Sequence, residues 1–267
     1  MRLGRWIAQR EQMGRPCFSI EEARAAFPMF STGVLSALLS RYRAKGIIQS
    51  VHKGFFVVMP AQYALQGRVP DLYYIPQLME YLNRPYYISL LSAASFWGAS
   101  HQAVMTTHLM TCLPQSSMSR RKNSTIRWFY RSSVPKEFLV AKNGETAPVL
   151  YSNAELTAID LIHWAIKIGC LSMVATVLDE LREATNFEGA SSGVFLTADT
   201  SDVQRLGYVY DVVLGDTLQG DVIYKEMKKL HSTVRNISLV PGNHERTLRN
   251  NARWHIKVNT EIEVDDL

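Results

Sequence analysis

The chain has 267 residues, of which 47% are hydrophobic, and its formal net charge is +5. This length and composition allow one or two domains with a sizeable core, and no run approaches the roughly 18 consecutive apolar residues of a membrane-spanning helix. The three cysteines are far apart and form no CxxC pair, and no apolar leader follows the N-terminus. We therefore expect a cytoplasmic protein without disulfides or a zinc site.

Positive charge is concentrated at the N-terminus. Residues 1–60 hold nine basic and three acidic side chains, a balance of +6, so the remaining residues sum to −1. A basic excess at one end is typical of a nucleic-acid-binding module attached to an otherwise ordinary domain. A solvated basic face without a partner is the alternative.

Two short helices are expected first. Helical spacing of apolar residues predicts a helix over Leu3–Met13, and the Gly-Arg-Pro at 14–16 breaks it. Ser19 and Glu22 have the spacing of a capping box, which predicts that a second helix begins there. That helix should end before Pro28, because proline cannot continue it.

A third helix follows, capped by Ser31 or Thr32 and ended at Lys45-Gly46. Its apolar stripe should face the core: Val34, Leu35, Leu38, Leu39 and Tyr42. The opposite face should be exposed, and it consists of Gly33, Ser36, Ala37, Ser40, Arg41 and Arg43. Small residues at the start of that face would let the helix enter a major groove deeply.

Two strands, Ile47–Ser50 and Phe55–Val58, are expected around a turn at His52-Lys53-Gly54. A basic helix followed by a hairpin is typical of a winged helix-turn-helix module, in which the helix enters a groove of duplex DNA. We expect phosphate or base contacts from Arg41, Arg43, Lys45 and Lys53, groove readout from Ser36 and Ser40, and a helix N-terminus presented to a phosphate by Ser31 and Thr32.

The rest of the chain predicts a linker and connecting helix at 63–85, with the helix near Ile75–Leu82, and then a larger mixed domain at 86–267. Expected helices are Tyr87–Gly98, Asn153–Ile168, Leu171–Thr185, Asp202–Leu214 and Asp221–Leu230. Expected strands are Gln102–Leu113, Thr125–Arg131 and Trp254–Val264. The fold class is therefore α+β, with a winged helix-turn-helix domain at 1–62 followed by a mixed α/β domain.

A Ser/Arg-rich loop is expected at Gln115–Lys122, where three cations are adjacent. Arg120, Arg121 and Lys122 are candidates for phosphate contacts, and a surface loop without a partner is the alternative.

Several segments together carry a family resemblance. Besides the N-terminal module they are RPYYISLLSAASFWGASHQ (Arg84–Gln102), Asn153–Leu161, QRLGYVYD (Gln204–Asp211) and RWHIKVNTEIEVD (Arg253–Asp265). In these segments the chain resembles AbiEi-type antitoxins of type IV toxin–antitoxin systems, which act in abortive infection, a form of phage defence.

The resemblance implies a transcriptional repressor of its own operon that binds inverted repeats of double-stranded DNA through the winged helix. It also implies that the second domain counters a nucleotidyltransferase-like toxin encoded next to it, with no stable complex required. Members often have more basic DNA-binding surfaces than this chain, which has Ser36 and Ser40 at outward positions, so the base contacts stay open.

Two other functions are alternatives. One is a ligand-responsive winged-helix repressor without a toxin partner. The other is a metallophosphoesterase, because Gly242-Asn243-His244-Glu245 resembles a motif of those enzymes and Gly215-Asp216 lies upstream. A two-metal centre needs several converging His, Asp and Asn ligands, and the Asp-x-His element is missing here. With no nucleophile elbow or Gly-rich phosphate loop either, we expect no enzyme, no cofactor and no metal.

Overall fold

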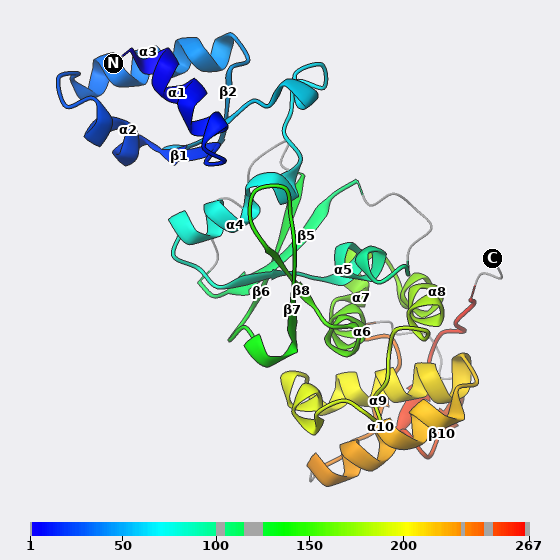
Figure 1. The fold of residues 1–267 in the computed structure, drawn as a ribbon. Helices are drawn as coiled ribbons and strands as arrows, with labels where there is room; N and C mark the ends of the chain where they lie inside the picture. The colour runs from blue at the N-terminus through cyan, green and yellow to red at the C-terminus, as the bar shows by residue number, and fades with distance from the viewer. Residues whose placement is uncertain (1, 100–104, 115–124, 231–232, 243–247, 265–267) are drawn as a thin grey trace. The chain divides into compact units, whose positions relative to one another are not determined.

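The computed structural model describes residues 2–99, 105–114, 125–230, 233–242 and 248–264 (Figure 1). The protein is mixed α+β, and the strands of the described residues form three sheets. The chain divides into two compact units. One comprises Met1–Tyr87, Leu109–Val134 and Ala141–Leu150, and the other comprises Ile88–His108, Pro135–Val140 and Tyr151–Leu267. Residues 109–134 and 141–150 thus group with the N-terminal residues, although the sequence assigned them to the 86–267 domain.

The first 58 residues fold as three helices and a small antiparallel sheet. The elements in order are α1 (Leu3–Gln12), β1 (Cys17–Ser19), α2 (Ile20–Ala26), α3 (Thr32–Ala44), β2 (Ile48–His52) and β3 (Phe55–Val58). The strand order in the sheet is β1-β3-β2. All three predicted helices and both predicted strands are confirmed. Strand β1 was not predicted, because three residues are too few to show an alternating pattern and only pairing with β3 makes them a strand.

Capping and aromatic packing hold these elements together. The Ser19 hydroxyl accepts a hydrogen bond from the Glu22 amide (3.1 Å), and the Glu22 carboxylate accepts one from the Ser19 amide (2.7 Å), so the predicted capping box is confirmed. The Trp6 ring packs edge-on against Phe18 and Phe27, which are buried with Leu35 and Leu39 of α3. The inner side of α3 therefore packs in this core.

The middle of the chain begins with a 3₁₀ turn, η1 (Ala61–Tyr63), and α4 (Asp71–Tyr81), and it includes a five-stranded sheet. The strands are β4 (Tyr86–Ile88), β5 (Thr107–Cys112), β6 (Ile126–Arg131), β7 (Leu139–Lys142) and β8 (Val149–Ser152), in the order β6-β5-β4-β8-β7. The 3₁₀ turn η3 (Lys136–Phe138) precedes β7.

Two predictions for this region were wrong in their bounds. Helix α4 begins at Asp71, four residues before the expected start, and includes Pro76 in its interior. The predicted helix Tyr87–Gly98 is divided between the end of β4 and α5 (Leu90–Phe96). Ile88 pairs in parallel with Tyr151, and this pairing makes Ile88 a strand residue although the local composition favours a helix.

The second unit is mainly helical (Figure 1). Its helices are α5, α6 (Ala154–His163), α7 (Ala165–Ile168), α8 (Leu171–Leu181), α9 (Thr200–Tyr208) and α10 (Thr217–Leu230), with a 3₁₀ turn η4 (Ser192–Thr197) and a π-helical turn η5 (Val209–Val213). A small sheet has the order β10-β11-β9, made of β9 (Ile237–Ser238), β10 (Arg249–Asn251) and β11 (Ile256–Val258). None of the described helices is long and apolar enough to cross a membrane.

Three elements of this unit differ from the sequence prediction in their bounds or type. The predicted helix Asn153–Ile168 is two helices, which meet at Trp164. The helix expected at Asp202–Leu214 begins at Thr200 and changes to a π-helical turn after Tyr208. Within the predicted strand Trp254–Val264, only β11 is a strand, because its partners β9 and β10 are themselves only two and three residues long.

Trp254 is the largest fully buried side chain of this unit, and α9 packs closely against its ring. A Cβ atom at Gly207 would lie closer than 3.0 Å to three atoms of its indole ring, so only glycine fits there. The indole Nε1 donates to Asp211 Oδ2 (2.8 Å), and the Gln204 amide donates to the Trp254 carbonyl (2.8 Å). The segments Gln204–Asp211 and Arg253–Asp265 are thus packed on one another.

The segments Arg84–Gln102 and Asn153–Leu161 meet in a similar way. Trp97 Nε1 donates to the Ser152 carbonyl (2.9 Å), just before Asn153 caps α6 by accepting from the Leu156 amide (2.9 Å). Helices α5 and α6 pack against each other. Of the segments that carry the family resemblance, residues 88–99 pack with 153–161 and residues 204–211 pack with 253–264, all within the second unit.

Candidate functional site

Helix α3 has a well-defined start. The Ser31 hydroxyl accepts a hydrogen bond from the Val34 amide (3.4 Å), which makes Ser31 rather than Thr32 the N-cap. The remaining amides of the first turn have no partner within the helix, so they retain the partial positive charge of a helix N-terminus. Both Ser31 and Thr32 are exposed.

The outer face of α3 is exposed as predicted. Every residue expected there is solvent-accessible: Gly33, Ser36, Ala37, Ser40, Arg41 and Arg43, together with Lys45 just beyond the helix. Leu35 and Leu39 are fully buried, and Leu38 and Tyr42 are partly buried against the core. Val34 was expected in the core but is 49% exposed. The predicted stripe was too wide, because Val34 lies about 100° round the helix from Leu35.

This face has no acidic side chain near it in the sequence. No Asp or Glu occurs between residues 31 and 59, whereas Arg41, Arg43, Lys45 and Lys53 lie in that segment and are exposed. A surface of this composition has a positive potential that attracts phosphate groups.

The tip of the β2–β3 hairpin is anchored rather than projecting. Gly54 has φ +77°, and its carbonyl accepts a hydrogen bond from the Ile20 amide (2.7 Å). The Tyr81 ring of α4 lies 5.0 Å from the Phe55 ring, and a Cβ atom at Gly54 would lie 3.1 Å from the Tyr81 hydroxyl. Lys53 is exposed at this turn, whose backbone these contacts hold in place.

Other N-terminal cations are not equivalent to those of α3. Arg10 is 17% exposed, pairs with Glu22 (3.1 Å), donates to the Cys17 carbonyl and lies over the Trp6 ring. It stabilises the core rather than offering a free charge. The predicted phosphate contacts Arg120, Arg121 and Lys122 lie outside the residues that the structure describes.

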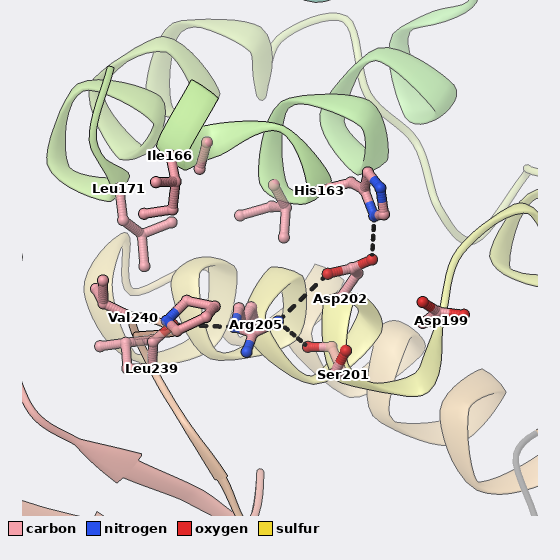
Figure 2. A pocket seen from close by; sticks show the side chains of 12 residues that line it. His163, Ile166, Leu171, Asp199, Ser201, Asp202, Arg205, Leu239 and Val240 are labelled. Atoms are coloured by element: carbon pink, nitrogen blue, oxygen red, sulfur yellow. Dashed lines mark hydrogen bonds and ion pairs between the residues drawn. The ribbon is translucent and has the colours of Figure 1, made fainter. Parts of the chain in front are cut away.

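A second candidate site is a cavity of about 320 Å³ in the helical unit (Figure 2). Apolar side chains of α6, α7, α8 and the segment after β9 line part of it, and α9 supplies the polar residues Ser201, Asp202 and Arg205. His163 of α6 and Asp202 point toward each other, with Nδ1 and Oδ2 2.6 Å apart. The second carboxylate oxygen of Asp202 pairs with Arg205 (3.3 Å).

This pairing sets the electrostatics of the cavity. The hydrogen bond to Asp202 raises the pKa of the His163 imidazole above its ordinary value, and partial burial opposes that shift. Burial lowers the pKa of Arg205. The Arg205 guanidinium also donates to the carbonyls of Leu239 (2.9 Å) and Ser238 (3.2 Å), so it binds the segment after β9 to α9.

The polar network of the cavity is therefore primarily structural. Both oxygens of Asp202 and most donors of Arg205 are engaged by the protein itself. The sequence analysis did not identify this network. Asp202 and Arg205 have the i,i+3 spacing of a helical ion pair, which was a readable signal, but their partner His163 is 39 residues away.

The residues considered for metal chemistry have other roles or lie outside the description. Asp216 Oδ1 accepts from the Gln219 amide (3.1 Å), so the Gly215-Asp216 element is a cap for α10. Gly242 is in a turn with φ +73°, and Asn243, His244 and Glu245 lie outside the described residues. Within the described part of the chain, no group of three or more His, Cys, Asp or Glu side chains could hold a metal ion.

Comparison with known proteins gives one informative result. No protein-family model matches the chain, and no curated protein matches it. Among solved structures, the crystal structure of the RV2827C protein from Mycobacterium tuberculosis is similar, with a TM-score of 0.66. The match covers 96% of this chain and 92% of that one, at 13% sequence identity. At such low identity the likeness concerns the fold, which is shared along nearly the whole of both chains.

Proposed function

We propose that this protein is a DNA-binding transcriptional repressor whose N-terminal residues form a winged helix-turn-helix. The element order α1-β1-α2-α3-β2-β3 and the small antiparallel sheet are those of such modules. The observation that carries the proposal is the exposed outer face of α3, with small residues at its start, arginines at its end and no acidic residue between 31 and 59. We place this face in a major groove.

Arg41 and Arg43 are the residues on which affinity should depend most. Each would bind a phosphate or a base edge, and each phosphate contact releases counterions, so binding should weaken steeply with added salt. Replacing both arginines by alanine should weaken binding to the protein's own promoter by about 2 kcal/mol, or about 30-fold.

A matched control separates contact from net charge. Lys225 and Lys257 are exposed cations of the other unit, so Lys225→Ala with Lys257→Ala removes the same two charges away from α3. Fluorescence anisotropy with the promoter duplex should show the large loss only for the α3 pair. If the two double variants lost affinity equally, the loss would be due to net charge alone, and the assignment of α3 as the DNA-contacting helix would be overturned.

We further propose that the protein is the antitoxin of a type IV toxin–antitoxin system. It would repress its own operon by binding inverted repeats, and the rest of the chain would counter a nucleotidyltransferase-like toxin encoded beside it. Support comes from the four segments that resemble AbiEi-type antitoxins, which lie in two packed pairs. Residues that pack on one another must match in size and shape. The resemblance therefore concerns a common core as well as scattered matches.

Coexpression with the neighbouring gene tests this second part. Wild-type protein should relieve the growth arrest caused by that gene. The full-length variant with Arg41→Ala and Arg43→Ala should also relieve it while losing repression of the promoter. Growth arrest that continues with the wild-type protein, at confirmed expression, would contradict the antitoxin role and leave the DNA-binding role standing.

The alternative is a ligand-responsive repressor without a toxin partner. The cavity beside His163 favours it, because about 320 Å³ lies at the lower end of the volumes found for small-molecule sites. A neighbouring gene that does not encode a nucleotidyltransferase, together with promoter binding that changes with a metabolite, would support this alternative.

A further inference from the structure

The first turn of α3 exposes an apolar side chain at the end of the helix that would lie nearest the bases in the proposed DNA complex. Val34 is 49% exposed although it lies within a helix whose neighbouring residues Leu35 and Leu39 are fully buried. It is the third residue of α3, in the first turn after the N-cap Ser31. In helix-turn-helix proteins the N-terminal residues of the recognition helix are the ones that reach base edges.

Gly33 beside it has no structural reason to be glycine. A Cβ atom there would meet no atom of the protein within 4 Å, and its backbone is not in the left-handed region. Glycine is a poor helix former, and alanine would stabilise the helix at such an open position. A residue that costs stability and contacts nothing in the free protein fits a surface that another molecule approaches closely.

The other exposed residues at this end of α3 offer little hydrogen-bonding capacity. Thr32, Ser36 and Ala37 are short, and none can form the bidentate contacts by which Arg, Asn or Gln distinguish bases. An apolar side chain in the major groove can distinguish thymine, because only thymine presents a methyl group there. Val34 is the exposed large hydrophobic residue among the residues of α3.

Positive charge lies on the same side of the helix, further along it. Arg41 follows Val34 by seven residues, which is close to two full turns and about 10 Å along the axis. That length is comparable with the width of the major groove, about 12 Å. With Val34 at a base edge, Arg41 would be near the phosphates that border the groove.

We propose that Val34 is a specificity-determining residue that contacts the 5-methyl group of a thymine in the major groove, with Gly33 at the point of closest approach. This inference rests on the proposed DNA-binding function. It predicts that the preferred duplex contains a required thymine whose methyl group, rather than its hydrogen-bonding edge, is recognised.

The test combines selection with removal of the methyl group. The full-length protein selects duplexes from a random library, and each conserved thymine of the resulting site is replaced by deoxyuridine, which differs only in lacking that methyl. Affinity should fall roughly fourfold at one position, the factor expected for losing one buried methyl-sized group. Repeating the titration with Val34→Ala should show weaker binding to the thymine duplex and no further loss with deoxyuridine.

Each outcome has a defined meaning. If the protein selects no duplex, the proposed function fails and the inference fails with it. If it binds a selected site but deoxyuridine has no effect, or weakens wild type and Val34→Ala equally, only the assignment of Val34 is overturned. If Val34→Ala instead changes the mass of the free protein in sedimentation, the exposed valine is a contact between copies of the chain, which also overturns it.

Gly33→Ala supplies an independent readout. This variant should keep or raise the thermal unfolding temperature, because alanine favours the helix and meets no protein atom. Its affinity for the selected duplex should nevertheless fall by about tenfold, through steric contact with the base edges. Unchanged affinity in Gly33→Ala would contradict a close approach at this point.

Discussion

Gly207→Ala is the substitution whose effect the structure determines most sharply. The new methyl group would lie closer than 3.0 Å to three atoms of the fully buried Trp254 ring. The ring cannot simply rotate away, because its Nε1 donates to Asp211 and it packs nearly perpendicular to the Tyr224 ring at a centroid distance of 5.5 Å. Relief of the clash therefore requires either a shift of α9 or loss of the indole hydrogen bond.

The size of the effect follows from these two options. Overpacking a core typically costs about 1–3 kcal/mol, and a hydrogen bond to a charged group contributes about 1.5–3 kcal/mol. Alanine in place of glycine in a helix returns up to about 1 kcal/mol. We expect the net free energy of unfolding of this unit to fall by about 1–2 kcal/mol, which corresponds to a decrease in Tm of about 2–8 °C.

Thermal unfolding followed by circular dichroism measures this directly, with Gly33→Ala as the matched control. Both substitutions add one methyl group to a helical glycine, but at Gly33 it meets no protein atom within 4 Å. The control should therefore be stabilised by about 0.4–1 kcal/mol. A Gly207→Ala protein that unfolds at or above the wild-type temperature would refute the packing described for Trp254.

Three further predictions concern single groups. Asp202→Asn should lower the pKa of His163 in an NMR titration. Because the pKa of His163 is raised in the folded protein, the stability that this pair contributes is present below about pH 6.5 and is lost as the pH rises through the folded pKa. Ser19→Ala should cost about 1 kcal/mol in chemical denaturation, since it removes a helix cap. Burial raises the pKa of Cys17 to about 12, so iodoacetamide at pH 8 should modify the exposed Cys170 and leave Cys17 unmodified in mass spectrometry.

Local signals in the sequence were sufficient for the N-terminal elements. The Ser19–Glu22 capping box, the cap at Ser31 and the glycine turn at Gly54 act through neighbours within a few residues, and the structure has each of them. Val34 shows the limit of periodicity. The pattern gives the direction of the buried side of α3, but the width of that side depends on what packs against it, and at Val34 nothing covers the side chain completely.

Long-range pairing explains what the sequence did not predict. Strand β1 exists through its pairing with β3, and Ile88 is a strand residue through its pairing with Tyr151. The His163–Asp202 contact joins residues 39 positions apart, and periodicity contains no information about such a contact. The sequence also does not predict which bases Ser36 and Ser40 would contact, because such short side chains are compatible with many base sequences.

Binding of the protein's own promoter tests the central proposal most directly. A duplex carrying that promoter is titrated with the wild-type protein, with Arg41→Ala and Arg43→Ala together, and with the charge-matched Lys225→Ala and Lys257→Ala pair. We predict specific binding by the wild type, a loss of about 30-fold for the arginine pair, and little change for the lysine pair. Equal affinity of the wild type and the arginine pair for this duplex would contradict the proposal that α3 is the DNA-contacting element.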